Sequence, residues 1–170
     1  MATSSPPKRR KSRKKAPPRQ RTESREQSAE GFRAWLDYMA DGLREFFECL
    51  PAEVRTKLDY SVESLDVLEA WLLERYPSSD AAIQQSETLI IDGAARYVGE
   101  TFCKILGGHW WVDVKHDTFL GLPQITGFRP GPDSLCPLSY VTASTNRRRG
   151  DFISSILRIE LADRLERKQG

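Results

Sequence analysis

Both histidines of the chain lie in one short aromatic stretch, where they could serve as metal ligands. His109 and His116 could face each other across a hairpin, with Asp113 or Asp117 close to them. A metal ion needs several His, Cys or carboxylate ligands at spacings that let them converge. A histidine at the end of a strand beside tryptophans is more often a packed or solvated residue, so we expect no metal ion here.

Nucleophilic catalysis would need a cysteine thiolate activated by a neighbouring imidazole. Cys103 and His109 are the pair that could supply it, but Cys103 lies near the C-terminal end of a predicted helix, where the helix dipole raises a thiol pKa. We therefore expect Cys103 to fill the core. With Cys49 and Cys136 the cysteines are three in number and form no C-x-x-C pair. This argues against a disulfide framework or a structural zinc site and favours a reducing cytoplasm.

The double glycine Gly107-Gly108 is not followed by a helix that carries Lys-Ser or Lys-Thr, so a phosphate-binding loop is not supported. The dinucleotide-binding fingerprint is also missing. Acidic residues are scattered over amphipathic helices, where they normally form the solvated face, and no pair stands out for acid and base roles. We expect no catalytic residue and no cofactor. A small enzyme with a pocket near the 109–117 hairpin stays open as an alternative.

Basic residues are concentrated at the start of the chain, where residues 1–21 hold nine Lys or Arg and no acid. Such a tail binds polyanions by releasing counterions, with a salt slope of about −0.9 per phosphate neutralised. It has no aromatic residue to stack on bases, so it does not predict sequence readout. A solvated terminus without a role is the alternative. The candidate nucleic-acid contacts are Lys8, Arg9, Arg10, Lys11, Arg13, Lys14 and Lys15.

The rest of the chain is acidic. Beyond residue 21, the other 17 of the 26 basic residues stand against all 24 acidic residues, a net charge of −7.

A length of 170 residues suits one domain with a proper core. No apolar run approaches the roughly 18 residues that a membrane-spanning helix needs. The tail is not followed by the apolar stretch of a secretory signal, so we expect a cytoplasmic protein.

Residues 1–28 are rich in Pro, Ser, Lys and Arg, and we expect them to be disordered. Apolar residues at spacings of three and four predict a first helix from Phe32 to Leu50, which Pro51 ends. Ser61 can cap a second helix that runs to Tyr76. Its apolar stripe is Leu65, Leu68, Leu72 and Tyr76.

The third and longest helix is predicted to start at Ser78-Ser79-Asp80 and to stop at Gly107-Gly108. Its apolar stripe is Ile91, Ala94, Val98, Phe102 and Ile105. Gly93 and Gly99 lie inside it at a cost of about 1 kcal/mol each relative to Ala, so they predict close approach of a neighbouring element.

Short aromatic and β-branched stretches at 109–114 and 119–128 predict a hairpin, and Leu138 to Thr142 predicts a third strand. Asp151 can cap a last helix. Its predicted stripe is Phe152, Ile156, Ile159 and Leu161 to Leu165.

One part of the chain resembles a pattern in small, uncharacterised bacterial domains. The pattern is a helix with Y-x-G-E, a double-glycine stop and a Trp that opens a strand, and here it is Tyr97-Val98-Gly99-Glu100 followed by Leu106-Gly107-Gly108-His109-Trp110. The helix with Leu65-Asp66-Val67-Leu68-Glu69 fits the same arrangement. The resemblance covers residues 58–142 and implies a non-enzymatic binding protein. Some of the domains with this pattern belong to toxin and immunity systems. It transfers no catalytic residue, and the basic tail lies outside it.

Together these patterns predict an α+β domain over residues 29–170, with three or four helices packed on a small antiparallel sheet and a disordered basic tail in front. The predicted function is a non-catalytic protein-interaction module of the bacterial cytoplasm, of immunity type, whose acidic surface meets a basic partner. Tyr97 and Glu100 lie off the apolar stripe and either face the partner or pack under the first helix, with packing favoured. His109 and Trp111 complete the candidate partner contacts. The rival from another class is a nucleic-acid-associated protein anchored by the tail, whose salt-dependent binding would vanish when residues 1–21 are deleted.

Overall fold

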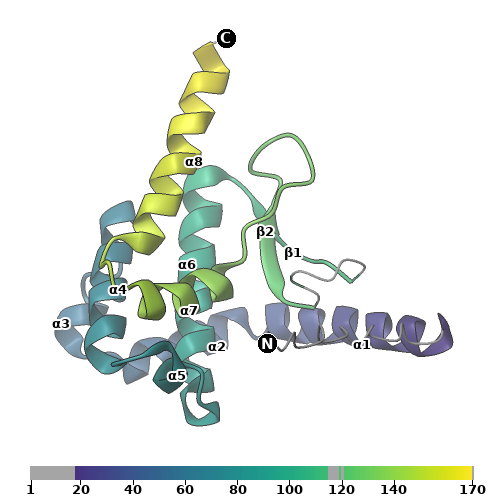
Figure 1. Ribbon diagram of the computed structural model, residues 1–170, viewed down its shortest axis with the longest axis horizontal. Coiled ribbons are helices and arrows are strands. Elements are labelled where there is room, and N and C mark those ends of the chain that lie inside the picture. The colour runs from purple at the N-terminus through teal and green to yellow at the C-terminus, as the bar shows by residue number, and fades with distance from the viewer. Residues whose placement is uncertain (1–17, 115–118, 120, 170) are drawn as a thin grey trace, which may run out of the picture.

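The computed structural model describes residues 18–114, 119 and 121–169, which form a mostly helical fold with one two-stranded sheet (Figure 1). The helices are α1 (Pro18–Asp37), α2 (Met39–Cys49), α3 (Ala52–Arg55), α4 (Val62–Arg75), α5 (Ser79–Ala82), α6 (Thr88–Leu106), α7 (Pro137–Arg147) and α8 (Phe152–Gln169), with a 3-10 turn η1 (Gln85–Glu87) before α6. The strands are β1 (His109–Val112) and β2 (Pro123–Thr126). The predicted combination of helices with a small antiparallel sheet is confirmed, although the described residues contain eight α-helices where three or four were predicted.

Helix α6 is the centre of the fold, and most of its side chains are buried. It packs against α2, α4, α7 and α8 and also contacts both strands. The predicted apolar stripe faces the core, since Ile91, Ala94, Val98 and Phe102 are buried and Ile105 is half-buried against it. Gly107 ends the helix in the left-handed conformation, with φ +81°, and its N–H donates to the carbonyl of Cys103.

The two glycines inside α6 allow neighbouring aromatic rings to approach the helix backbone, as predicted. A Cβ on Gly93 would overlap Phe46 of α2, and a Cβ on Gly99 would overlap the ring of Trp110 on β1. Any larger residue at these positions would push α2 or the hairpin away from the central helix.

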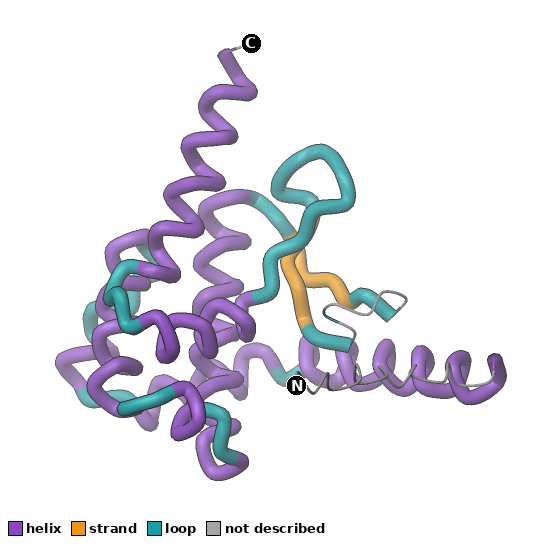
Figure 2. Tube along the Cα trace, viewed as in Figure 1, coloured by secondary structure: helices purple, strands orange, loops and turns teal. Residues whose placement is uncertain are grey.

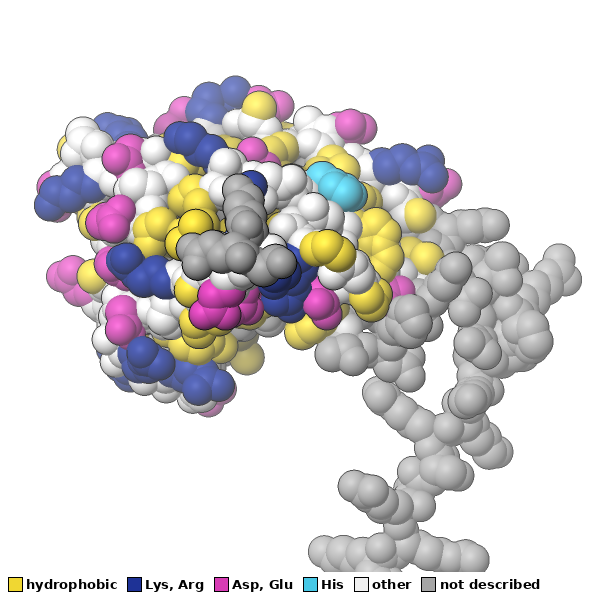
Figure 3. Space-filling model, turned by 90° about the horizontal axis from the view of Figure 1, so that it is seen from above, with side chains coloured by type: hydrophobic (Ala, Val, Ile, Leu, Met, Phe, Trp, Pro, Cys, Tyr) yellow, Lys and Arg dark blue, Asp and Glu magenta, His cyan; other side chains and the backbone are white. Residues whose placement is uncertain are grey.

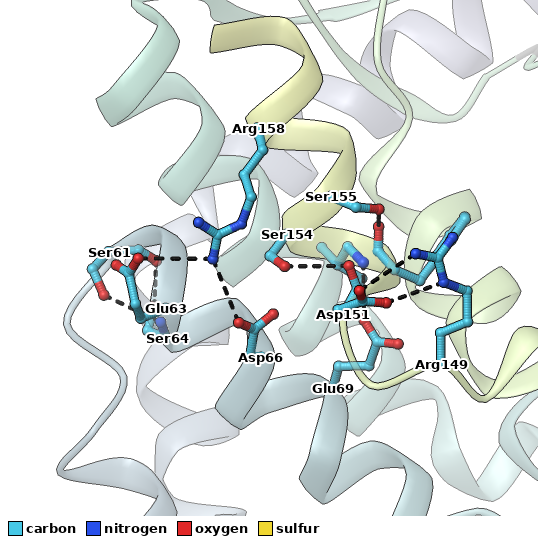
Figure 4. A network of polar contacts seen from close by, with 12 residues as sticks. Ser61, Glu63, Ser64, Asp66, Glu69, Arg149, Asp151, Ser154, Ser155 and Arg158 are labelled. Atoms are coloured by element: carbon cyan, nitrogen blue, oxygen red, sulfur yellow. Dashed lines mark hydrogen bonds and ion pairs between the residues drawn. The ribbon is translucent and has the colours of Figure 1, made fainter. Parts of the chain in front are cut away.

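Helices α4 and α8 are joined by a buried carboxylate. Ser61 caps α4 as predicted, by accepting from the N–H of Ser64 at 3.1 Å. Farther along α4, the fully buried Glu69 accepts from the N–H groups of Gly150 and Ile153, each at 2.9 Å. These donors lie at the start of α8, where N–H groups lack partners within the helix and the dipole favours an anion (Figure 4).

The first predicted helix is broken in two. A turn at Tyr38 separates α1 from α2, and the Trp35 carbonyl just before it accepts from the guanidinium of Arg96. Helix α1 also begins at Pro18, inside the segment expected to be disordered. The Arg, Gln and Glu residues at 19–27 have good helix propensity, which explains the extension. The part of the predicted tail before residue 18 lies outside the described residues.

The predicted start of the third helix is wrong. Ser78 caps only the short helix α5, by accepting from the N–H of Ala81. Gln84 then adopts an extended backbone, and α6 starts only at Thr88. The carboxylate of Glu87 is held by α4 and fixes the intervening turn.

The predicted third strand is also wrong, because Leu138 to Thr142 lie in α7. Pro137 takes the first position of the helix, where its missing N–H costs nothing. The hydroxyls of Ser144 and Thr145 donate to carbonyls three residues earlier, which satisfies them within the helix. The β-branched residues within Leu138 to Thr142 therefore did not indicate a strand.

Helix α8 begins after Asp151 as predicted, but its predicted core stripe is only partly correct. Phe152, Ile156 and Leu161 are half-buried and pack against the core. Ile153 and Leu157 are fully buried, whereas Ile159 and Leu165 are 59% and 60% exposed. The inner face continues with Glu160, which accepts from Arg129 at 3.1 Å. Apolar periodicity does not assign a charged residue such as Glu160 to a buried position, so this part of the inner face was not predicted.

The predicted hairpin is confirmed. Strands β1 and β2 pair antiparallel, with His109 opposite Thr126 and Trp111 opposite Gln124. Ile125 forms a further bridge to Leu135 on the other side of β2. Figure 2 shows the hairpin beside α1, away from α4 and α8. Within the described part of the chain, we find no helix with the length and apolar character needed to cross a membrane.

The close contact at Gly99 gives a stability prediction. Gly99→Ala should lower the free energy of unfolding by about 1–3 kcal/mol, because the new Cβ has no room beside Trp110. Gly31→Ala in α1 is the matched control, since nothing lies within 4 Å of its Cβ and Ala favours helix. Urea unfolding measures both. Equal stability of the wild-type and Gly99→Ala proteins would contradict the packing described here.

Candidate interaction surface

Three of the four tryptophans lie where α1 meets the hairpin, Trp35 on α1 and Trp110 and Trp111 on β1. The rings of Trp35 on α1 and Trp110 on β1 meet edge to face, with centroids 4.9 Å apart at 72°. Phe32, one turn earlier on α1, stacks on Trp35 at 6.4 Å. Trp111 lies next to Trp110 on the opposite face of the strand. We call Phe32, Trp35, His109, Trp110 and Trp111 the aromatic surface.

Two carboxylates of α6 hold two of these tryptophans by their indole N–H groups. Trp35 Nε1 donates to Asp92 Oδ1 at 2.7 Å, and Trp110 Nε1 donates to Glu100 Oε1 at 2.7 Å. Asp92 and Glu100 are two turns apart on α6, so they lie on one face of the helix. A half-buried indole N–H needs an acceptor, and these bonds fix both rings in position.

Arg96 lies one turn from each of the two carboxylates, and its side chain is only 3% exposed. Its Nε donates to Asp92 Oδ2 at 2.7 Å, and its Nη1 donates to the carbonyl of Trp35 at 2.8 Å. The guanidinium also lies 4.0 Å from the centroid of the Trp35 ring. A buried cation is stable only when it is paired and hydrogen-bonded, and here one cation bonds both α6 and the end of α1.

The outer face of β1 carries the exposed part of the aromatic surface. Successive residues of a strand point to opposite faces. Trp110 and Val112 are half-buried and point inward, whereas His109 and Trp111 are exposed. Trp111 retains 40% exposure, which is high for a tryptophan that a rigid strand presents.

The four residues predicted to contact a partner therefore differ in their exposure. His109 and Trp111 are accessible side by side, and Glu100 is half-buried and engaged with Trp110. Tyr97 is fully buried, which excludes it as a partner contact. Its hydroxyl lies 2.6 Å from that of Ser64, and its ring packs against Phe47 of α2, so the favoured packing interpretation is correct for Tyr97.

The chemistry near the hairpin is limited. Burial, with a further contribution from Glu100, raises the pKa of the Cys103 thiol to about 12, so a thiolate is strongly disfavoured at neutral pH. In the described ranges, no group of three or more His, Cys, Asp or Glu side chains is placed to hold a metal ion. His116 and Asp117 lie outside the described residues.

Sequence reasoning missed Trp35, Asp92 and Arg96 as members of this site. Trp35 was included only among the apolar residues that predict the helix from Phe32 to Leu50, and the two α6 residues were not considered. The signal was present in the spacing, since Asp92, Arg96 and Glu100 alternate in charge at intervals of four, the spacing of neighbours on one helix face.

No protein-family model, curated protein or solved structure matches this chain. The resemblance to small bacterial domains with a Y-x-G-E helix therefore stays a prediction. The predicted nucleic-acid contacts of the tail, all between residues 8 and 15, lie outside the described residues.

The anchoring of α1 gives a prediction for Trp35→Phe, which keeps an aromatic ring but removes the N–H that Asp92 accepts. Losing a hydrogen bond to a charged group should cost about 1.5 kcal/mol, or roughly a tenfold rise in local opening of α1. Limited trypsin digestion, with cleavage after Arg33 followed by mass spectrometry, measures that opening. Trp111→Phe is the matched control and should leave cleavage after Arg33 unchanged. Equal rates in the two variants would show that the indole bond does not anchor α1.

Proposed function

We propose that this protein is a non-catalytic protein-interaction module of the bacterial cytoplasm, and that Trp111 and His109 lie at the centre of its contact surface. The observation that carries the proposal is the 40% exposure of Trp111 on the outer face of β1. Tryptophan is enriched among the residues that contribute most to binding energy at protein interfaces. A function that resembles that of immunity proteins is the narrower form of the proposal, and it rests on the sequence resemblance.

The rigid support beneath Trp111 favours a binding role. Its neighbour Trp110 is bonded to Glu100 and packed on Gly99, so β1 is held against the central helix. A preorganised contact residue loses little conformational freedom when a partner binds. The strand therefore holds the backbone of Trp111 in place.

The charge of the body favours a basic partner. Residues 22–170 carry a net charge of −7, which steers cationic surfaces toward the domain. Association should accordingly weaken as ionic strength rises, because exposed charges are screened within about 10 Å at 0.1 M salt.

The described residues give less support to nucleic-acid binding. On the face seen in Figure 3, Lys and Arg side chains alternate with Asp and Glu. The arginine run 147–149 is used within the fold. Arg148 donates to the carbonyls of Leu73 and Tyr76, and Arg149 pairs with Asp151 at 3.0 Å. The nucleic-acid alternative therefore depends on the tail alone.

Site-specific photo-crosslinking tests the proposal. A benzophenone amino acid at position 111 should yield a reproducible adduct with one cellular protein, whereas the same probe at the exposed Lys57, next to α3, should not. Addition of unlabelled wild-type protein in excess should suppress the adduct. No adduct from position 111, together with measured turnover of a small substrate by the protein, would overturn the proposal.

A further inference from the structure

A pocket of about 330 Å³ lies between the end of α4 and the turn that leads into α6. None of its lining residues belongs to the aromatic surface. It is open to solvent, and its lining residues are Arg75, Tyr76, Ala81, Gln84, Ser86 and Glu87. Its size falls within the range of small-molecule sites. It combines the cation of Arg75 and the carboxylate of Glu87 with the apolar surface of Ala81 and the Tyr76 ring.

The ion pair in this pocket is asymmetric. Arginine and carboxylate usually pair through two parallel bonds, one to each oxygen. Here both Nε and Nη2 of Arg75 donate to the same oxygen, Glu87 Oε2, at 3.1 and 2.9 Å. The hydroxyl of Tyr76 donates to that oxygen as well, at 2.6 Å.

The second carboxylate oxygen, Glu87 Oε1, and the third guanidinium nitrogen, Arg75 Nη1, consequently make few hydrogen bonds. Among described residues, Glu87 Oε1 accepts only a long bond of 3.4 Å from Ser86, and Arg75 Nη1 has no hydrogen bond. Both side chains remain partly exposed, at 42% for Arg75 and 21% for Glu87. One carboxylate oxygen of the ion pair and one guanidinium N–H donor are thus available to a ligand.

The surroundings keep both groups charged and in place. The bonds from Tyr76 and then Arg75 lower the pKa of Glu87, so its carboxylate stays ionised through the neutral range. Burial, followed by the bond to Glu87, raises the pKa of Tyr76 to about 12, so its hydroxyl remains a donor. The guanidinium of Arg75 also lies 5.8 Å from the Trp71 ring and 5.5 Å from the Tyr76 ring.

We propose that this pocket binds a free α-amino acid, with its ammonium group on Glu87 Oε1 and its carboxylate on Arg75 Nη1. A zwitterion fits because it supplies a cation to the unused oxygen and an anion to the unused nitrogen. Its side chain would lie against Ala81. Because the site is open to water, ion pairing is screened and the dissociation constant should be about 1 mM.

NMR titration of the full-length protein with L-leucine tests this directly. Saturable shifts should occur in the backbone amides of residues 84–87. N-acetyl-leucine lacks the ammonium group and leucinamide lacks the carboxylate, so each should bind at least tenfold more weakly, about the cost of one lost charged hydrogen bond. Equal shifts with all three compounds would show that only the apolar side chain is bound and would overturn the proposal. The absence of any shift would overturn it as well.

Matched variants assign the binding to the ion pair. Glu87→Gln keeps an oxygen for Tyr76 and Arg75 but removes the charge, and it should abolish saturable binding of L-leucine. Glu74→Gln, an exposed change on α4 next to Arg75, should not alter it. The amide spectrum of Glu87→Gln outside residues 75–90 shows whether the fold is intact. If that spectrum is unchanged and leucine still binds with wild-type affinity, the assignment is wrong.

Discussion

The buried guanidinium of Arg96 is the interaction on which the arrangement of α1, α6 and the hairpin depends. A cation with a side chain only 3% exposed must find its partners inside the protein, because water cannot solvate it. Arg96 finds them in Asp92 of its own helix and in the carbonyl of Trp35 on α1. The second bond lies next to the turn at Tyr38, where α1 ends and α2 begins. It also places Trp35 against Trp110, which Glu100 holds from the same face of α6.

This constraint explains why one tryptophan remains outside. With Trp110 committed to the inner face, alternation along β1 places Trp111 on the outer face. The fold thus uses two tryptophans to attach α1 and β1 to the central helix and presents the third to solvent. In the proposed function, this exposed side chain is the part of the strand that a protein partner covers.

The sequence was sufficient to predict the elements that depend on residues close together in the chain. The Ser61 cap, the stop at Gly107, the hairpin and the close approaches at Gly93 and Gly99 were all predictable, because each depends on residues a few positions apart or on the absence of a side chain. Two of the errors lie where a distant polar residue makes a contact. Arg96 bonds the Trp35 carbonyl, 61 residues away, next to the turn that divides the first predicted helix, and Arg129 bonds Glu160 on the inner face of α8. Neither pairing can be read from apolar periodicity, and for the same reason Trp35 was not recognised as part of the site.

Hydrogen exchange of the tryptophan indole N–H groups, followed by NMR, is the most direct test of this account. The structure predicts slow exchange for Trp35 and Trp110, whose N–H groups are bonded to Asp92 and Glu100, and fast exchange for the exposed Trp111. Exchange of Trp35 as fast as that of Trp111 would show that α1 is not anchored. Slow exchange of Trp111 in the isolated protein would show that this ring is covered within the fold, and would contradict its proposed role as a contact residue.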